Sequence, residues 1–444
     1  MWISRDFDGG KIAAGALPIK VLKGPRQVGK TSVLERLETH RVVYLDDIAA
    51  RSRAAADPRG FLDALPPRLV LDEASLAPPL FEELKRRVDE QRRKARGGAA
   101  ARELDVWITG SNQTLLQRHV RESLAGRASY FDLNTLSIHE LALGWQLDDH
   151  LLLGGWPELR VSPGLDPVRY LNDLIATFIE RDIVSAAGIE RHAAFTKCLQ
   201  LTAARVGQLM NYSELGAAAG VELTTVQSWL AVLETNGILR RLQPWFTNLN
   251  QRLIKAPKFY FEDVALATRL QGWTDRRLLL ASPLAGSLIE NLAVGEIARF
   301  FINRGLQPRL NHVRSKEKVE IDLLVHLSNG RTVAVEVKSA AAGFDRRQVR
   351  LLETLGLDVV ERWVVTPAGG RGDATARMVP FARIWDELDR LEPSRGEQEP
   401  VVQPGPRASS ASAGTRLRRP SCREALQLRP VSGRPRGRSR GRSR

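Results

Sequence analysis

The feature of this 444-residue chain that most constrains its fold is a glycine loop near the N-terminus. Apolar residues at 19, 21 and 22 lead into Gly-Pro-Arg-Gln-Val-Gly-Lys-Thr at residues 24–31, and apolar residues at 33, 34 and 37 follow at helical spacing. Strand, loop and helix in this order match G-x-x-x-x-G-K-[ST] at every fixed position. Glycines let backbone N–H groups turn into such a loop, where they bind phosphate together with the helix N-terminus. The segment therefore predicts a nucleotide-binding loop.

The loop suggests roles for individual side chains, with ATP as the expected nucleotide. Lys30 is expected to reach the β- and γ-phosphates, and the Thr31 hydroxyl is expected to bind Mg²⁺. The residues expected to contact the nucleotide are Gly24, Pro25, Arg26, Gln27, Val28, Gly29, Lys30, Thr31 and Ser32. A loop of this sequence can also occur by chance, but the flanking strand and helix make that alternative the weaker one.

Two acids follow a second apolar run, Arg-Leu-Val-Leu-Asp-Glu at residues 68–73. A buried parallel strand of this kind delivers carboxylates to its C-terminal edge. We expect Asp72 to hold Mg²⁺ with its water and Glu73 to orient the attacking water. A third strand ends in Gly-Ser-Asn at residues 110–112, where a polar side chain either senses the γ-phosphate or caps a glycine turn. With the apolar runs at 42–45 and 130–133 this predicts about five strands of a parallel α/β sheet.

The order of these and later motifs resembles a family of prokaryotic AAA-type ATPases. In that family the C-terminal half is a domain of unknown function that ends in a restriction-endonuclease-like fold. The resemblance runs from about residue 16 to about residue 391 and includes Leu-Ala-Gly-Arg at 124–127, Gly-Gly-Trp-Pro-Glu at 154–158 and Arg-Asp-Ile at 181–183. It implies that Arg127 stabilises charge during ATP hydrolysis, while a simple salt bridge is the alternative for this arginine.

From residue 167 to about residue 270 the apolar residues recur at helical spacing. A short helix near 212, a glycine turn at 220, a longer helix over 223–237 and two strand-like runs together predict a winged helix-turn-helix. Thr224, Thr225, Gln227 and Ser228 would begin its recognition helix. That helix has no Arg or Lys before Arg240, so DNA contact and a packing module remain equal alternatives.

Residues 320–338 predict a β-hairpin around the turn Ser-Asn-Gly at 328–330. A two-residue turn would mix apolar and charged side chains on both faces of the hairpin. A three-residue turn with Gly330 in the left-handed conformation instead pairs Leu323 with Val335 and makes one face wholly apolar. We therefore expect the three-residue turn.

On the opposite face this register places Asp322 across from Glu336. Opposed acids repel and raise each other's pKa, so we expect a divalent cation between them, with a partly solvated acid pair as the alternative. The pattern also resembles the D…[DE]-x-K nuclease signature, which implies that both acids bind magnesium and that Lys338 polarises water or stabilises the phosphate. By the same resemblance Glu290 is a further acid of the site. Arginines at 346, 347 and 350 either meet phosphates or form the wet face of their helix.

Composition and charge set the expectations about compartment and partners. Of the net charge of +15, residues 393–444 carry +10, with thirteen Arg and three Glu, and this tail is expected to be disordered. It either binds a polyanion such as nucleic acid or is a solvated extension. No apolar run approaches the roughly 20 residues of a membrane span, no apolar signal core begins the chain, and the two cysteines form no framework. We expect a cytoplasmic protein without a membrane partner.

Together these patterns predict a multidomain α/β protein with boundaries at residues 1–165, 166–281, 282–392 and 393–444. The expected parts are a P-loop ATPase domain, a helical region with a winged helix-turn-helix, a C-terminal α/β domain and the basic tail, and the resemblances imply that the first is AAA-type and the third PD-(D/E)xK nuclease-like. The expected function is Mg²⁺-dependent ATP hydrolysis coupled to a nuclease-like domain that acts on DNA or RNA. The alternative is a non-cleaving switch in which ATP changes how the helix-turn-helix and C-terminal domains contact nucleic acid or another protein. A homo-oligomer is a separate expectation about partners.

Overall fold

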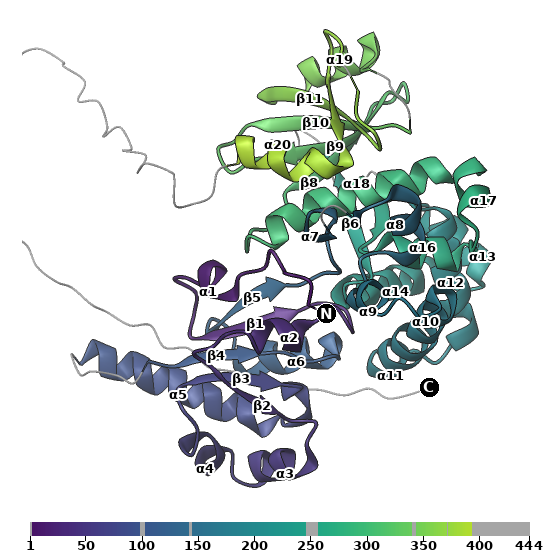
Figure 1. Cartoon of the computed structure of the whole chain (residues 1–444). Coiled ribbons are helices and arrows are strands. Elements are labelled where there is room, and N and C mark those ends of the chain that lie inside the picture. The colour runs from purple at the N-terminus through teal and green to yellow at the C-terminus, as the bar shows by residue number, and fades with distance from the viewer. Residues whose placement is uncertain are drawn as a thin grey trace, which may run out of the picture. The chain divides into compact units, whose positions relative to one another are not determined.

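The computed structural model describes residues 2–97, 103–141, 144–245, 256–339, 343–370 and 372–392 (Figure 1). These residues belong to one folded unit, Met1–Ser394. The predictions made for the arginine-rich tail, residues 393–444, lie outside the described residues.

The N-terminal part is a parallel sheet, as the sequence predicts. Its five strands lie in the order β2-β3-β4-β1-β5, and every neighbouring pair is parallel. The strands are β1 (Ile19–Lys23), β2 (Arg41–Tyr44), β3 (Arg68–Asp72), β4 (Asp105–Ile108) and β5 (Ala128–Asp132). Leu69 and Leu71 pack with Phe81 on one face, and Val70 packs with Trp107 on the other. Burial on both faces explains why the central strands are apolar along their whole length.

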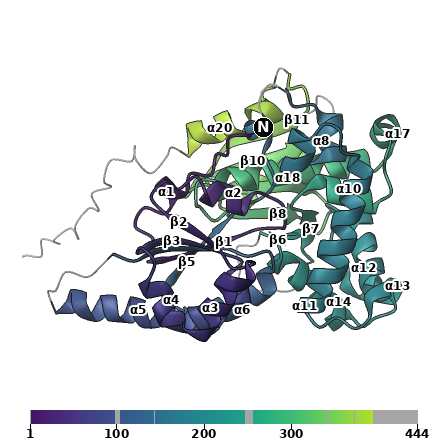
Figure 2. The same ribbon diagram turned by 60° about the horizontal axis from the view of Figure 1, so that its bottom comes forward.

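Short connections join this sheet to its helices. The helices are α1 (Gly9–Ile12), α2 (Lys30–Leu34), α3 (Ile48–Ala56), α4 (Pro58–Asp63), a 3₁₀ turn at Ala74–Leu76, α5 (Pro79–Arg96) and α6 (Gln113–Ser123). Figure 2 shows α3, α4, α5 and α6 along the same side of the sheet. α2 follows β1 through the glycine loop, with Gly29 as its N-cap, so the loop lies at the carboxyl edge of the sheet.

The middle of the chain is helical, which confirms that expectation. Its helices are α7 (Ile138–Leu141), α8 (Leu147–Leu153), α9 (Pro157–Val161), α10 (Pro167–Leu174), a π-helix at Ile175–Ile183, α11 (Val184–Ala186), α12 (His192–Ala204), α13 (Tyr212–Ala219), α14 (Leu223–Thr235), α16 (Val264–Leu270), α17 (Arg276–Ala281) and α18 (Ala285–Ile302). α18 packs against α16, β7, β10 and α20, whose bounds follow below, and its side chains are buried on most sides. Across the described ranges no helix is long and apolar enough to span a lipid bilayer.

A second, mixed sheet of seven strands forms the C-terminal part, in the order β12-β11-β10-β9-β8-β6-β7. Its strands are β6 (Leu239–Pro244), β7 (Lys258–Phe261), β8 (Leu310–Arg314), β9 (Glu320–His326), β10 (Thr332–Val337), β11 (Val359–Thr366) and β12 (Arg377–Pro380). The helices that follow β10 are α19 (Arg346–Thr354), a 3₁₀ turn at Phe381–Arg383 and α20 (Ile384–Leu391). β6 pairs in parallel with β8, so the two strands expected to end the winged helix-turn-helix continue the C-terminal sheet.

The hairpin of β9 and β10 has the expected register. Leu323 pairs with Val335 and Val325 with Val333. Gly330 has φ 85°, the left-handed conformation that the three-residue turn requires. The paired side chains on the apolar face are fully buried, which explains why this register is favoured over its neighbours.

Candidate functional site

The backbone of the glycine loop has an unusual conformation. Gly24, Gln27 and Gly29 all have positive φ, at 147°, 61° and 88°. A Cβ atom at Gly24 would lie 2.0 Å from the carbonyl oxygen of Leu133, so only glycine fits against the segment that follows β5. A left-handed residue beside ordinary ones, as at Gln27 and Gly29, turns neighbouring N–H groups to one side and makes a concave anion site. The local backbone therefore suits phosphate.

Lys30 lies inside this loop. Its ammonium group donates to the carbonyl oxygens of Gly24, at 3.0 Å, and Pro25, at 2.6 Å. Burial lowers the pKa of Lys30 to about 8, and the nearby carboxylates of Glu73 and Asp72 oppose that shift. A buried ammonium that donates to loop carbonyls is well placed to donate to a phosphate oxygen instead.

Thr31 and Asp72 meet at the carboxyl end of β3. The Thr31 hydroxyl lies 3.1 Å from both carboxylate oxygens of Asp72. Burial raises the pKa of Asp72, and the hydrogen bond from Thr31 opposes that shift. A hydroxyl and a carboxylate side by side are oxygen donors of the kind that Mg²⁺ prefers, so these residues fit the expected ion.

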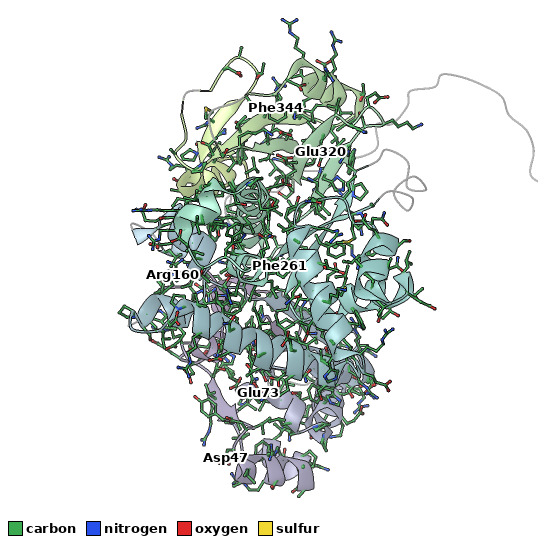
Figure 3. All side chains as sticks on the ribbon, turned by 90° about the vertical axis from the view of Figure 1, so that its right-hand side faces the viewer. Asp47, Glu73, Arg160, Phe261, Glu320 and Phe344 are labelled. Atoms are coloured by element: carbon green, nitrogen blue, oxygen red, sulfur yellow. The ribbon has the colours of Figure 1, made fainter. Side chains whose placement is uncertain are left out.

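Glu73 is turned toward the strand beside it. Its backbone is left-handed, with φ 52°. Its carboxylate accepts hydrogen bonds from the Ser111 backbone N–H at 2.9 Å and from the Ser111 hydroxyl at 3.1 Å (Glu73 is labelled in Figure 3). Asn112 instead caps α6 by accepting from the Leu115 N–H at 3.0 Å. Of Ser111 and Asn112, Ser111 is therefore the one beside the acids.

Two residues in the middle of the loop, Arg26 and Gln27, contact the helical region. Arg26 forms an ion pair with Asp182 of the π-helix. The Gln27 side-chain carbonyl accepts from the Tyr170 hydroxyl of α10 at 2.7 Å. Sequence reasoning did not identify Asp182 or Tyr170 as partners of the loop, although Arg-Asp-Ile at 181–183 was a motif of the family resemblance. Val28 is buried behind the loop, and Ser32 is half-buried in α2.

The structure does not bring Arg127 to this loop. Its guanidinium group forms a two-point ion pair with Asp89 of α5, at 2.8 and 2.9 Å. Arg127 precedes β5, and Ala128 pairs with Ile19 at the start of β1. It therefore lies at the amino edge of the parallel sheet, opposite the loop, in the kind of ion pair that the alternative interpretation expects.

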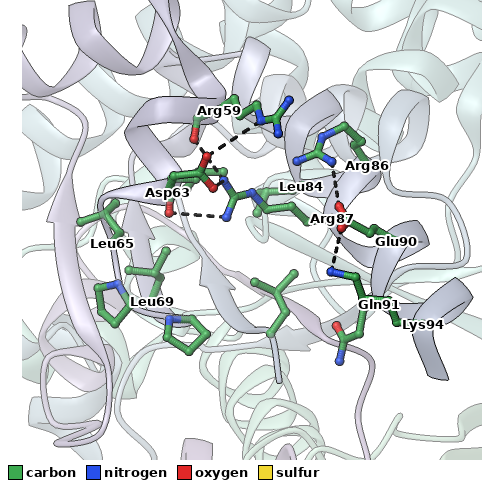
Figure 4. A pocket seen from close by; sticks show the side chains of 14 residues that line it. Arg59, Asp63, Leu65, Leu69, Leu84, Arg86, Arg87, Glu90, Gln91 and Lys94 are labelled. Atoms are coloured by element: carbon green, nitrogen blue, oxygen red, sulfur yellow. Dashed lines mark hydrogen bonds and ion pairs between the residues drawn. The ribbon is translucent and has the colours of Figure 1, made fainter. Parts of the chain in front are cut away.

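The pocket in Figure 4 lies at the amino edge as well. It is lined by residues from α4, α5 and the start of β3, among them Arg59, Leu69 and Gln91. Arg87 is ion-paired with Asp63 at 2.7 Å within it. Because the nucleotide loop is at the carboxyl edge, this pocket is separate from the candidate nucleotide site.

The C-terminal acids gather at one pocket, between β7, α18 and the hairpin. The predicted residues that line it are Glu290, Asp322, Glu336 and Lys338. The Asp322 N–H donates to Glu336 at 3.2 Å, and the Val337 N–H donates to Asp322 at 2.9 Å. Lys338 donates to Glu336 at 2.7 Å. The two opposed acids therefore face the same way, with the lysine beside them.

Two partners of these acids, Lys258 and Tyr260, were not predicted from the sequence. Lys258 of β7 contacts Glu290 at 3.0 Å and Glu320 at 2.6 Å (Glu320 is labelled in Figure 3). The Tyr260 hydroxyl donates to Glu290 at 2.6 Å. The only sequence signal for them was the strand-like run at 258–261, which gave no indication that it would lie against α18.

Two acids of this pocket have a raised pKa. Burial, and next the nearby charge of Asp322, raise the pKa of Glu336 to about 7 and that of Glu290 to about 7. Burial alone would lower the pKa of Lys338, but Asp322 and Glu336 outweigh it and raise the pKa. Among the residues that the structure describes, no three His, Cys, Asp or Glu side chains are gathered so that they could hold a metal ion. A cation bound by Asp322 and Glu336 would therefore need further ligands that are not His, Cys, Asp or Glu side chains of the described residues.

Three family models match the chain. Residues 17–142 match an AAA domain. Residues 144–277 and residues 285–371 each match a domain of unknown function, DUF8612 and DUF4143 respectively.

Two relatives have the same degree of similarity to the chain. They are the uncharacterized proteins Rv2008c of Mycobacterium tuberculosis and Mb2031c of Mycobacterium bovis. Each is 30% identical over 339 residues, which cover 75% of this chain and 73% of the relative.

Solved structures of two archaeal proteins are also similar. The Walker-type ATPase PABY2304 of Pyrococcus abyssi is 16% identical, with 60% of this chain and 96% of that chain covered and a TM-score of 0.34. The ORC2 protein of Aeropyrum pernix, in its ADPNP and ADP complexes, is 11% identical, with 62% and 92% covered and a TM-score of 0.24.

Proposed function

This chain belongs to the family of the mycobacterial proteins Rv2008c and Mb2031c, with an AAA-type ATPase domain at residues 17–142, and on this premise we propose that it is a Mg²⁺-dependent ATPase. The observation that carries the proposal is the meeting of Lys30, Thr31 and Asp72 at the carboxyl edge of a parallel sheet. These three groups are the ammonium, hydroxyl and carboxylate that phosphoryl transfer in P-loop enzymes requires.

Each side chain has a distinct role in this proposal. Lys30 exchanges its loop carbonyls for the β- and γ-phosphate oxygens, while the loop N–H groups hold the phosphates. Thr31 and Asp72 would hold Mg²⁺, which when bound neutralises charge that develops on the phosphates. Glu73 orients the attacking water once its carboxylate leaves Ser111. Arg127 has no role at the nucleotide of its own chain, because it lies at the other edge of the sheet.

Binding and turnover separate these roles. Lys30→Ala should abolish ATP binding, whereas Glu73→Gln should keep binding and lower turnover by at least about 100-fold, the usual contribution of a general base. Lys85→Ala is a matched control because it removes a lysine of the same domain from α5, where Lys85 is paired with Glu82. Calorimetry and phosphate release measure the two quantities. Equal ATP affinity in wild type and Lys30→Ala would refute the nucleotide site.

We also propose that residues 282–392 form a restriction-endonuclease-like domain whose pocket acts on DNA or RNA. Asp322 and Glu336 would hold one divalent cation, which when bound supplies positive charge at a phosphodiester. Lys338 would polarise the water or stabilise the phosphate, and Glu290 would be a further acid of the pocket, paired with Lys258. Support comes from the shared pocket and from the raised pKa of Glu336, since a cation relieves the repulsion between two close acids.

The other predicted divisions follow the same layout. Residues 1–165 would be the ATPase domain, and residues 166–281 would include a winged helix-turn-helix built from α12, α13, α14, β6 and β7. The antiparallel pairing of β6 with β7 after three helices supports this proposal. The first two turns of α14 expose Thr224 and Gln227, and this helix has no Arg or Lys. Binding assays are therefore needed to separate packing from DNA contact.

Cleavage is tested with single-stranded DNA, duplex DNA and RNA in Mg²⁺ or Mn²⁺, resolved on a gel. Asp322→Asn should remove all cleavage. Asp358→Asn is the control, because Asp358 is an exposed acid of the same domain ahead of β11. Cleavage that survives Asp322→Asn would belong to a contaminant or another site, and wild type without cleavage would leave the ATPase proposal standing alone.

A second candidate function is a non-cleaving switch that ATP controls. The contacts of Arg26 with Asp182 and of Gln27 with Tyr170 favour it, because they tie the loop directly to the helical region. Hydrogen exchange with and without a non-hydrolysable ATP analogue should change over residues 167–183. Unchanged exchange there, with the analogue bound, would contradict the switch.

A further inference from the structure

The segment ahead of the first strand contributes a buried arginine to the back of the nucleotide loop. Arg5 donates from Nε to Glu140 at 2.8 Å, from Nη1 to the Val28 carbonyl at 2.8 Å and from Nη2 to the Asn134 carbonyl at 2.7 Å. Its side chain is only 4% exposed. One guanidinium group thus links the loop, the segment after β5 and α7.

The contact with Val28 fixes one peptide unit of the loop. In a trans peptide the C=O and the next N–H point in opposite directions. Because Arg5 holds the Val28 carbonyl, the Gly29 N–H is directed away from Arg5. Gly29 has φ 88° and caps α2, so this N–H lies directly ahead of Lys30. Free rotation of the same peptide would present a carbonyl oxygen to the phosphate and repel it.

Arg5 is itself held rigidly. The Glu140 side chain is fully buried, and besides Arg5 it accepts from the Asp6 N–H at 2.9 Å and the Ser137 N–H at 2.7 Å. A buried ion pair adds little net stability, because desolvation offsets the attraction between the charges. The three directed hydrogen bonds of Arg5 are therefore better explained by orientation than by stability.

We propose that Arg5 is a positioning residue of the nucleotide site. It does not touch the nucleotide, but by holding the Val28 carbonyl it aims the Gly29 N–H at the β-phosphate. This inference rests on the proposed nucleotide site at residues 24–32. Since the β-phosphate is common to ADP and ATP, the loss of Arg5 lowers the affinity for both nucleotides by the same factor.

Arg5→Ala tests the proposal by calorimetric titration of the full chain with ADP and with ATP. We expect both dissociation constants to rise about 10-fold, the effect of one misdirected hydrogen bond of about 1.4 kcal/mol. KM for ATP should rise by a similar factor, with kcat at saturation close to that of wild type. The dissociation constants of Arg5→Lys should lie between those of wild type and Arg5→Ala, because one ammonium group can replace the bond to Val28 but not all three bonds.

Asp6→Ala is the matched control. Asp6 is the next residue, and its carboxylate pairs with His139 of α7 at 2.9 Å, so the variant loosens the same segment without touching the loop. It should lower the melting temperature but leave ADP and ATP affinity unchanged. Weakening as large as that of Arg5→Ala would assign the effect to packing of the segment and overturn the proposal.

The remaining outcomes are also decisive. If wild type binds ATP and Arg5→Ala binds it equally well, the positioning role is refuted while the nucleotide site stands. If wild type binds no ATP, the proposed function fails first. Should Arg5→Ala not fold, Arg5→Met replaces it, since this change keeps a long buried side chain but cannot donate to the Val28 carbonyl. Wild-type ADP and ATP affinity in that variant would refute the role.

Discussion

His150 of α8 is a fully buried histidine, and neither of its ring nitrogens has a hydrogen-bond partner among the described residues. Burial lowers its pKa well below the ordinary value, and the positive charges of Arg160 and Arg299 act in the same direction. The side chain is therefore neutral in the folded protein, where it packs as a flat, largely apolar ring. It takes up a proton only when the chain unfolds.

This histidine should make the folded state acid-sensitive. Below the unfolded pKa of about 6.5 the unfolded chain binds a proton that the folded chain does not, so stability falls as pH falls, by up to about 1.4 kcal/mol per pH unit. His150→Leu should remove that contribution, and His192→Gln, which changes an exposed histidine, should keep it. Urea unfolding at pH 7.5 and 5.5 measures the difference. An identical loss in wild type and His150→Leu would contradict the assignment.

Comparison with wild type is needed because a buried acid acts in the opposite sense. Burial raises the pKa of Glu296 to about 7, despite its ion pair with Arg299. A raised carboxyl pKa lowers stability as pH rises from about 4.5 to 7, since the unfolded chain releases this proton in that range while the folded chain still holds it. That contribution is the same in both proteins, so it cancels in the difference.

Individual site residues differ in how far the sequence could predict them. Lys30, Thr31 and Asp72 were predicted because the loop and the end of the next apolar strand are local patterns, and parallel topology brings them to one edge. Arg5 and Asp182 could not be predicted, since their contacts with the loop depend on how distant segments pack. Nor could the sequence show that Glu73 would turn to Ser111, because nothing local demands a left-handed backbone at a glutamate.

At the scale of elements, the hairpin of β9 and β10 was the most predictable piece of the C-terminal part. Side chains alternate with a period of two, so only one register buries all the apolar residues on one face. The pairing of β6 with β8 was not predictable in this way. It joins strands separated by a long stretch of helix, and the short contact at Gln243 and Pro244 leaves no pattern in the sequence.

The turn of that hairpin provides a test at this scale. Gly330 has φ 85°, and a Cβ atom there would meet no other atom within 4 Å, so Gly330→Ala adds backbone strain without a clash. We expect Gly330→Ala to lower the free energy of unfolding by about 1 kcal/mol. Gly286→Ala in the first turn of α18 is the matched control, because Gly286 has an ordinary helical backbone and equally open space. It should be neutral or stabilising. Urea unfolding gives both values, and equal effects would contradict the strain argument.

At the scale of the whole described unit, one sheet joins the proposed second and third domains. Asn291 of α18 is buried, accepts from the Phe261 N–H at 2.7 Å and donates to the Phe261 carbonyl at 2.8 Å. β8 likewise has β6 as its partner on one side. A domain boundary at residue 281 would therefore separate groups that are hydrogen-bonded to one another: Asn291 from Phe261, and β8 from β6.

Two fragments test this consequence. Residues 282–392 alone should be less soluble and less stable than residues 237–392, because the shorter fragment leaves the Asn291 amide unsatisfied, at about 1–3 kcal/mol, and uncovers an edge of β8. Soluble yield and thermal melting compare them. If the shorter fragment were as stable as the longer one, β6 and β7 would contribute no stability to the C-terminal sheet.

Lys258 carries a fixed positive charge on a strand from one part of the chain into an acidic pocket built mainly by another. With it in place, Glu290 and Glu320 already have a counter-ion that never diffuses away. Any shift of β7 that withdrew this ammonium would remove an ion pair from both carboxylates, and Glu320 would keep only its 3.2 Å ion pair with Arg314. The charge balance of the pocket therefore depends on where β7 lies, because this strand supplies the ammonium group that two of the acids share.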